Sequence, residues 1–521
     1  MTLKEMLETA AGRYGGKAAV TLGGRRLAYT ELDRSSNKVA NALIEMGVGR
    51  GHRVAMLLTN SLEFAVIYFG IVKTGAIAVP LDTKYKTNEL ACLFDSCRPR
   101  VLVTESPYLE LVTPLLSRFN YIENIITLGP DDNGQFQSYH QIMANSSARP
   151  VAAVVEADDV AHIAYTSGPA LRPRGVMLIH RHLVVAAGIS AAGFGQTDKD
   201  VVVLFALPMH HAVGLVVILL TSIYKGSKVV MLPGLSISGL METIEREKAT
   251  IFMGVPFIHA LLIREAETAG IRHDLDSLRV CASAGSPLPV DTMKRFQELF
   301  SKRLIQFYGL TEATVHVTCQ PIDGSGKLGS VGRALPAWQL KIVDDDGREL
   351  GPNQPGEIAV KGPFMKGYYN NPQATAEAIR DGWLYTGDIA RLDEEGCLFL
   401  SGLKKPMLIS KGQNIYYSDV ETVLSAHHKV AEVAVVGVAD PDGMRGEVVR
   451  AVIRLKAGEK ATEPEIKRFC LERLANYKVP KQVIFLDSLP KTAAGNINRE
   501  ALKGDLLTVS SVDRAAGEMV L

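Results

Sequence analysis

The feature that most constrains the fold is an alternation of short apolar runs with helical stretches. Residues 54–58 and 76–81 have the composition of buried strands, and the stretch between them at 62–73 has helical periodicity. The pattern returns further along the chain, with apolar runs at 101–103, 201–204, 228–231, 251–253 and 280–284. This βα alternation predicts an α/β fold with mainly parallel sheets and helices on their faces.

The length of the chain and a change in its texture predict the domain organisation. A chain of 521 residues is too long for one compact core, so we expect at least two domains. Residues 330–400 are rich in glycine and short alternating strands, which indicates a β-rich subdomain. We expect a large N-terminal domain of stacked βα sheets plus this subdomain over 1–403. A small, mobile α+β C-terminal domain would occupy 404–521, with a hinge near 402–406.

Composition excludes several classes of protein. A formal net charge of +1 argues against a dedicated nucleic-acid binder. The six cysteines have no metal-ligand spacing, so we expect no disulfide framework and a reducing, cytoplasmic location. The longest apolar run, 213–223, is about half of what a bilayer crossing requires. It is therefore interpreted as a buried strand or helix, and we expect no membrane span.

The segment 165–176, YTSGPALRPRGV, has the two ends of a phosphate-binding loop but lacks the residues that would bind the phosphate. Such loops need glycines, backbone N–H groups, hydroxyls and a cation. The opening Thr-Ser-Gly and the closing Pro-Arg-Gly-Val are present. Between them Pro169 has no N–H, and Leu171 cannot easily adopt the conformations that glycine allows.

Together with further segments in order, this loop resembles the adenylate-forming acyl-CoA synthetase family over residues from about 10 to 505. The segments are PMHHAVG at 208–214, SAGSPL at 283–288, YGLTE at 308–312, GEI at 356–358, GY at 367–368, YTGD at 385–388, KGQNI at 411–415 and PKTAAG at 490–495. In that family a carboxylate attacks the α-phosphate of ATP to give an acyl-adenylate. A thiol, usually that of CoA, then displaces AMP, and a small C-terminal domain rotates between the steps.

The resemblance implies an AMP site made of Ser283, Ala284, Gly285, Tyr308, Gly309, Thr311 and Asp388. The tyrosine would stack on adenine, the threonine would bond the phosphate, and the aspartate would accept from both ribose hydroxyls. Glu312 would hold Mg²⁺ if Mg²⁺ is used. Ordinary explanations stay open: a tight core turn at 283–285, a strand-to-helix turn at 308–312, and a turn-capping aspartate at 388.

The resemblance also implies an acyl pocket and a thiol tunnel. The pocket residues are His210, Val213, Gly214, Met253, Val255 and Pro256, and the CoA tunnel residues are His211, Lys411 and Gly412. His211, Thr311 and Gly412 form the predicted catalytic set. The adjacent histidines suggest a metal site, but neighbours on a strand point to opposite sides. We therefore expect no joint ligation by His210 and His211, and a gate or a core role stays open for them.

The sequence departs from the family at positions that serve adenylation. These positions are Pro169, Ala170, Leu171, Arg174, Leu403, Pro406 and Asn496. The family usually has two hydroxyls and a glycine at 169–171, a lysine at 174 and a lysine at 496. Removing one preorganised donor from a charged transition state costs roughly 10²–10³ in rate, so adenylation is predicted to be lost or very weak. Leu403 replaces a ribose-contacting arginine, and Pro406 stiffens the hinge.

The thioester-forming step makes fewer demands, because an acyl-adenylate is already activated. The sequence therefore predicts a non-adenylating enzyme that moves an acyl group from a preformed acyl-adenylate to CoA and releases AMP. A separate adenylating enzyme would supply the substrate, as in the split acyl-CoA ligases of some natural-product pathways that this chain resembles. The alternatives are a complete ATP-dependent acid–CoA ligase with Arg174 and Lys491 compensating, a pseudoenzyme that binds AMP or acyl-CoA, and transfer to a carrier-protein thiol.

Overall fold

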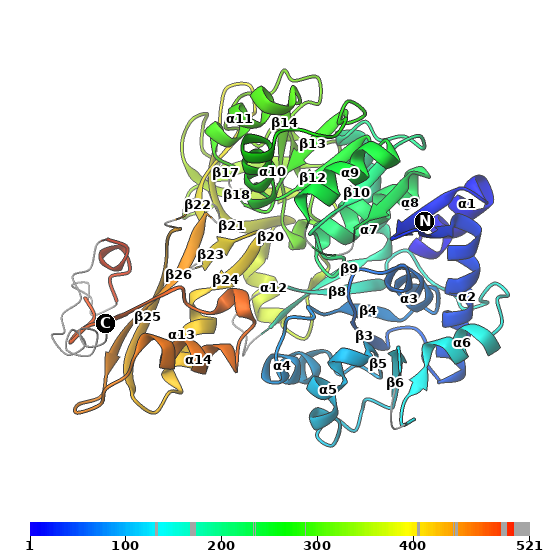
Figure 1. Ribbon diagram of the computed structural model, residues 1–521, viewed down its shortest axis with the longest axis horizontal. Helices are drawn as coiled ribbons and strands as arrows, with labels where there is room; N and C mark the ends of the chain where they lie inside the picture. The colour runs from blue at the N-terminus through cyan, green and yellow to red at the C-terminus, as the bar shows by residue number, and fades with distance from the viewer. Residues whose placement is uncertain are drawn as a thin grey trace. The chain divides into compact units, whose positions relative to one another are not determined.

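A computed structural model describes residues 1–130, 134–166, 173–232, 234, 236–286, 288–403, 407–440, 442, 446–490 and 497–504. The chain forms two compact units (Figure 1). The larger contains the described residues of 1–83, 93–166 and 174–403, and the smaller contains 84–92, residue 173 and the described residues after 406. The predicted α/β class, with a large N-terminal and a small C-terminal domain, is confirmed.

A nine-stranded sheet forms one half of the larger unit, in the order β16-β15-β14-β13-β12-β10-β11-β1-β2. Its strands are β1 (Ala18–Leu22), β2 (Arg25–Ala28), β10 (Val201–Leu204), β11 (Lys228–Met231), β12 (Ile251–Gly254), β13 (Val280–Ser283), β14 (Leu304–Tyr308), β15 (Thr318–Cys319) and β16 (Arg333–Ala334). The pairs from β11 to β14 are parallel, as the βα alternation predicted. Helices α9 (Ile237–Glu247), α10 (Pro256–Ala269) and α11 (Val290–Phe300) pack beside β12–β14 (Figure 1).

An eight-stranded sheet has the order β19-β9-β8-β4-β3-β5-β6-β7. Its strands are β3 (Arg53–Leu57), β4 (Ile77–Pro80), β5 (Val101–Glu105), β6 (Asn124–Leu128), β7 (Gln137–Ser138), β8 (Val160–Thr166), β9 (Arg174–Ile179) and β19 (Gly367–Tyr368). Helix α3 (Leu62–Lys73) contacts both β1 and β4, and so lies between the two sheets. That position explains why it is buried on nearly all sides and apolar all round.

The remaining helices of the larger unit pack around these two sheets and against one another. They are α1 (Leu3–Tyr14), α2 (Tyr29–Glu45), α4 (Thr87–Cys97, which begins in the smaller unit), α5 (Leu109–Leu116), α6 (Tyr139–Asn145), α7 (His180–Gly193) and α12 (Pro372–Ala378). The apolar run at 213–223 is helical: a π-helix, η2 (Val213–Leu220), continues into α8 (Thr221–Lys225). Among the described residues, no helix is long and apolar enough to cross a bilayer.

The glycine-rich region after residue 330 forms a five-stranded sheet, which confirms the predicted β-rich part. Strands β17 (Gln339–Val343), β18 (Gly356–Lys361), β21 (Trp383–Leu392) and β20 (Ile379–Arg380) pair in that order, and β22 (Leu398–Leu403) pairs with β21. All of these pairs are antiparallel. Short antiparallel strands joined by turns account for the many glycines in this region.

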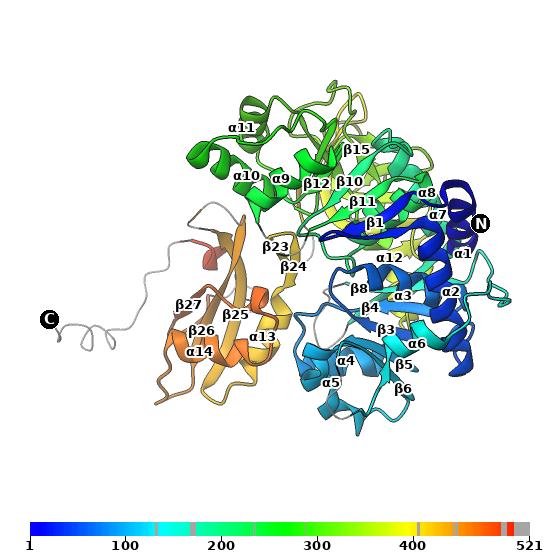
Figure 2. The ribbon, with the colours of Figure 1, turned by 45° about the vertical axis from the view of Figure 1, so that its right-hand side comes forward.

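The smaller unit contains a three-stranded sheet of β25 (Val430–Ala439), β26 (Glu447–Leu455) and β27 (Gln482–Phe485), seen from the side in Figure 2. Helices α13 (Tyr417–Ser425) and α14 (Glu463–Leu471) pack on one face with Val435 and Ile453. Val436 and Val452 point to the other face, where they pack with Leu489 and Leu502. Both faces are buried, which accounts for the nearly continuous valine run of β25. A hairpin of β23 (Met407–Ser410) and β24 (Gln413–Tyr416) precedes α13.

Candidate active site

The predicted AMP and acyl segments of the larger unit gather at the carboxyl ends of parallel strands. Ser283 ends β13, Tyr308 ends β14, and Met253 lies in β12 just before Val255 and Pro256. In open α/β sheets, ligands bind at this edge because the loops there are free to diverge. The register pairs the last residues of β12 and β13, so these two segments are neighbours.

The run 283–285 forms a tight turn with one feature that a turn does not require. The Ala284 N–H donates to the Gly254 carbonyl at 3.3 Å, and Gly285 has a φ of +84°, which favours glycine. This backbone satisfies the ordinary explanation for the small residues. However, the Ser283 hydroxyl is buried and has no hydrogen-bond partner among the described residues. A buried hydroxyl of this kind marks a place where a ligand or a water would add the missing bond.

Tyr308 and Asp388, both assigned to AMP, are bonded to each other. The Tyr308 hydroxyl donates to Asp388 Oδ2 at 2.6 Å. Burial, and then the Asp388 charge, raise the pKa of Tyr308 well above its ordinary value, so the hydroxyl stays protonated and donates. The sequence reasoning missed this bond, because the two residues are 80 positions apart and no local pattern connects them.

A β-bulge between β18 and β21 holds Asp388 in place. The pairing register shifts beside Glu357, whose carboxylate accepts from the Gly387 N–H at 2.9 Å. The Asp388 N–H donates to Thr386 Oγ1 at 3.1 Å. Bulges of this kind commonly re-aim a side chain next to a site. On the neighbouring strand the backbone of Leu403 pairs directly with Asp388.

The turn after β14 orients Glu312 and is tightly constrained. A short 3₁₀ helix, η3 (Thr311–Ala313), follows the strand, and Val315 has a φ of +84°, an outlier for a β-branched residue. A Cβ on Gly309 would lie 1.2 Å from the Val315 carbonyl oxygen. Glycine is therefore required at 309 by folding alone, whatever its distance from a nucleotide.

Glu312 fits the role of a magnesium ligand. Its carboxylate is buried, and Oε1 accepts from the Tyr368 hydroxyl at 2.9 Å. The Arg174 guanidinium carbon lies 5.4 Å from the centre of the Tyr368 ring, so the cation that begins β9 belongs to the same cluster. A single carboxylate, completed by substrate oxygens and water, suits Mg²⁺.

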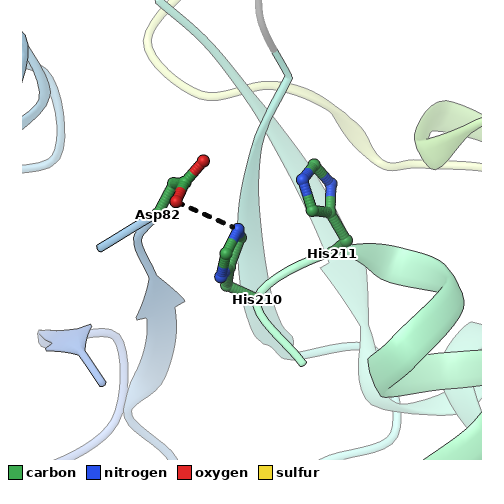
Figure 3. A group of neighbouring side chains, drawn as sticks. All are labelled: Asp82, His210 and His211. Carbon is green, nitrogen blue, oxygen red and sulfur yellow. Dashed lines mark ion pairs between the residues drawn. The ribbon is translucent and has the colours of Figure 1, made fainter. Parts of the chain in front are cut away.

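The histidine pair differs from the prediction. Residues 209–211 form a turn and a bend, not a strand, and the rings of His210 and His211 lie 4.7 Å apart (Figure 3). The expectation that they point to opposite sides was wrong, because strand alternation does not apply in a turn. Both histidines converge with Asp82, and His210 Nε2 lies 3.7 Å from Asp82 Oδ1. Sequence reasoning missed Asp82, although a carboxylate just after an apolar strand is a usable signal.

The other acyl-pocket residues lie near this turn or at the end of β12. Val213 begins η2 and is half-buried, and Met253 is fully buried. A Cβ on Gly214 would lie 2.3 Å from the Pro208 carbonyl oxygen, so close packing of the turn requires this glycine.

In the smaller unit, Lys411 and Gly412 are the two central residues of the β23–β24 hairpin. Their φ values are +51° and +78°, and Ser410 pairs with Gln413 across the turn. Two positive φ values define the type I′ turn that matches strand twist. The hairpin thus gives Gly412 a structural reason independent of a tunnel, and its tunnel role stays a prediction. The positions Pro169, Ala170, Leu171, Pro406 and Asn496 lie outside the described residues.

Two family matches cover most of the chain. Residues 7–369 match the family described as AMP-binding enzyme, and residues 419–496 match the AMP-binding enzyme C-terminal domain. The chain belongs to the AMP-binding enzyme family. This places it among the acid–thiol ligases of the acyl-CoA synthetase type and confirms the family resemblance.

Relatives of this AMP-binding enzyme match it along nearly its whole length. A long-chain-fatty-acid–CoA ligase of Bacillus subtilis (strain 168) is 32% identical, over 96% of this chain and 94% of the relative. An indoleacetate–CoA ligase of Aromatoleum aromaticum is 32% identical, over 96% and 98%. Among solved structures, the o-succinylbenzoate CoA synthetase of Bacillus subtilis is 30% identical with a TM-score of 0.84, over 96% of this chain and 98% of that chain. The amide bond synthetase McbA of Marinactinospora thermotolerans is 28% identical with a TM-score of 0.88, over 96% and 99%.

Proposed function

We propose that this AMP-binding enzyme transfers an acyl group from a preformed acyl-adenylate to the thiol of CoA and releases AMP. The observation that carries the proposal is the loss of adenylation groups. Pro169, Ala170 and Leu171 replace hydroxyls and glycine in the phosphate loop, and Asn496 replaces a lysine. A cation and several donors to the triphosphate are therefore missing, and these are the groups that stabilise charge during adenylation.

The groups that thioester formation needs are supported by the geometry. Asp388, oriented by Tyr308, would bind the ribose hydroxyls, and the Ser283 hydroxyl has a bond left to make near the end of β13. Thr311 would bond the phosphate. The CoA sulfur would then attack the acyl carbon, the bond from that carbon to the phosphate oxygen would break, and AMP would leave with the electron pair. We propose that the thiol proton passes to the His211 imidazole or to water.

A second candidate is a complete ATP-dependent acid–CoA ligase. The curated relatives are named as ligases, and two local features also favour it. Arg174 keeps a positive charge near Tyr368, and the same tyrosine hydroxyl positions the Glu312 carboxylate for a magnesium ion. In this candidate the arginine would replace the family lysine at the phosphates.

Two parallel incubations separate the candidates. One contains a carboxylic acid, ATP, Mg²⁺ and CoA, and the other contains the synthetic acyl-adenylate and CoA. Product from the second alone supports the proposal, and product from both supports the complete ligase. If neither incubation gives product with free CoA, the acyl-adenylate incubation is repeated with a phosphopantetheinylated carrier protein. Acylation of the carrier indicates transfer to its thiol, and no acylation while AMP still binds indicates a pseudoenzyme.

A gain-of-function variant tests the reason for the lost step. Asn496→Lys, alone and with Arg174→Lys, should raise ATP-dependent pyrophosphate exchange by about tenfold or more, because a charged donor returns to the α-phosphate. Asn498→Lys is the matched control, since it adds the same charge two residues away. If neither variant raised exchange above this control, position 496 would not explain the loss.

The proposal has consequences for partners and organisation. A separate enzyme must make the acyl-adenylate, and the resemblance to split natural-product ligases points to a pathway of that type. We also propose functional domains at 1–403 and 404–521 with a hinge near 402–406. None of the six cysteines forms a disulfide within the described residues, and a cytoplasmic location stays a prediction.

A further inference from the structure

We propose that Asp82, His210 and His211 form a binding site for a divalent transition-metal ion of the zinc class. Within the described residues these three side chains converge, and each offers one ligand atom within 4.8 Å of the others (Figure 3). The ion would be held by one carboxylate oxygen and two imidazole nitrogens. Zinc accepts this donor set, and three protein ligands leave a fourth position open.

The distances are close to those of a bound ion. Zinc–nitrogen and zinc–oxygen bonds of about 2.0–2.2 Å place two ligands of a tetrahedral ion about 3.4 Å apart. The 3.7 Å between His210 Nε2 and Asp82 Oδ1 is only a few tenths longer. The ligand atoms of the three residues all lie within 4.8 Å of one another, so the widest pair must approach by at most about 1.4 Å, which rotation of the side chains supplies.

The backbone that carries these ligands is fixed from several sides. Asp82 comes two residues after β4. The turn that carries the histidines is held by Asn60, whose side chain accepts from the Met209 N–H at 2.7 Å and donates to the Leu207 carbonyl at 2.9 Å. The His211 N–H donates to the Pro208 carbonyl at 3.1 Å. A site on a fixed turn needs little rearrangement to bind an ion.

Burial and donor type select the class of ion. The Asp82 side chain is 4% exposed and that of His210 is 10% exposed. A buried carboxylate attracts a cation more strongly than an exposed one, because less water screens the interaction. Two imidazole ligands suit Zn²⁺, Co²⁺, Ni²⁺ or Cu²⁺ and disfavour Mg²⁺ and Ca²⁺. The site is therefore distinct in chemistry from the Glu312 position.

The proposed ion would regulate the enzyme by occupying the acyl pocket. His210 and His211 belong to the predicted acyl pocket and thiol entrance, so an ion there would compete with substrate. This consequence rests on the proposed acyl-transfer function, but ion binding does not. Binding can therefore be tested on protein that has no measurable activity.

The test is a Co²⁺ titration of the untagged, full-length, chelator-treated protein. We expect one tight equivalent with the visible absorption of low-coordinate Co²⁺, which Zn²⁺ displaces and Mg²⁺ does not. Asp82→Asn and His210→Gln should each weaken Co²⁺ binding by at least about tenfold. His428→Gln is the matched control, because His427 and His428 are also adjacent with rings 4.7 Å apart, and it should leave the tight site unchanged.

A second measurement on the parent protein avoids dependence on the variants. X-ray absorption of the Zn²⁺-loaded protein should show two imidazoles and oxygen ligands at about 2.0–2.2 Å. Absence of a tight equivalent, sulfur ligation by cysteines, or equal Co²⁺ affinity in the parent and both folded site variants would each overturn the proposal. Loss of thioester formation from acyl-adenylate and CoA on adding Zn²⁺, restored by a chelator, would extend it to regulation.

Discussion

The bond between Tyr308 and Asp388 yields a sharp prediction about nucleotide binding. Tyr308→Phe removes one hydroxyl and keeps the aromatic ring that is predicted to stack on adenine. The variant therefore separates stacking from the orientation of the ribose carboxylate. We expect AMP to bind more weakly because Asp388 loses a donor that fixes one of its oxygens.

The geometry sets the magnitude. The hydroxyl lies 2.6 Å from Asp388 Oδ2, and the Tyr308 side chain is 7% exposed. Buried hydrogen bonds to a charged group contribute about 1.5–3 kcal/mol. If all of that energy serves to orient the carboxylate, the AMP dissociation constant should rise about 10- to 100-fold. The raised pKa of Tyr308 implies that the penalty is the same from pH 6 to pH 9, because the hydroxyl stays protonated throughout.

Isothermal titration calorimetry with two nucleotides provides the assay. AMP should show the penalty, whereas 2′,3′-dideoxy-AMP should bind the parent and Tyr308→Phe with equal affinity, because it has no ribose hydroxyls. Asp388→Asn and the double variant complete a thermodynamic cycle, and Tyr224→Phe, at an exposed tyrosine, is the control. Equal penalties for the two nucleotides, or fully additive variants, would refute the idea that Tyr308 acts through Asp388.

Three further predictions follow from single positions. Gly309→Ala should destabilise the larger unit by at least about 2 kcal/mol in chemical unfolding, because the new Cβ would overlap the Val315 carbonyl oxygen. Gly12→Ala is the control: residue 12 lies inside α1 with open space around it, so this variant should be more stable by about 0.5–1 kcal/mol. Asparagine tolerates the left-handed backbone conformation at position 412, so Gly412→Asn should keep the turn. If the CoA thiol passes beside this residue, the added side chain should reduce thioester formation about tenfold without weakening AMP binding. Gly446→Asn, at a φ of +76°, is the control and should change neither property. Burial lowers the pKa of His162 from 6.5 to about 3. Between these two pH values the imidazole is protonated in the unfolded chain and neutral in the folded chain. The contribution of His162 to stability should fall by about 1.4 kcal/mol per pH unit from pH 6.5 towards pH 3, and His162→Leu should reduce the slope measured in urea unfolding by that amount. The part of the slope that comes from the other buried histidines, such as His316, should remain.

Period and composition predicted the elements that bury a continuous face. Helix α3 has the predicted bounds Leu62–Lys73, and β10 and β11 match the apolar runs at 201–204 and 228–231. These segments lie inside the larger unit, where the need to bury apolar side chains determines the structure. The spacing of the apolar residues in the sequence indicates which side chains are buried. The same reasoning left 213–223 open, because a fully apolar run fits a strand and a helix equally well until its neighbours are known.

The parts of the site that sequence reasoning missed depend on contacts between distant segments. Tyr308 and Asp388 meet because the nine-stranded and five-stranded sheets bring them together. Asp82 meets His210 because a turn, not a strand, carries the histidines. The Lys-Gly pair at 411–412 is different: a type I′ turn between alternating strands is a recognisable local signal, but the family resemblance drew attention to a tunnel instead.

Residues that the fold requires cannot distinguish an active acyl transferase from a pseudoenzyme. Gly309 and Gly412 have sufficient structural reasons, so their presence would persist in a chain that had lost all catalysis. Ser283 differs, because its buried hydroxyl makes no hydrogen bond to a described residue and so adds no hydrogen bond that stabilises the fold. Ser283→Ala should therefore leave stability unchanged or slightly raised in every case. Ser283→Ala should weaken acyl-adenylate binding only if the nucleotide binds at the carboxyl end of β13. Position 283 therefore tests nucleotide binding more decisively than Gly309 or Gly412.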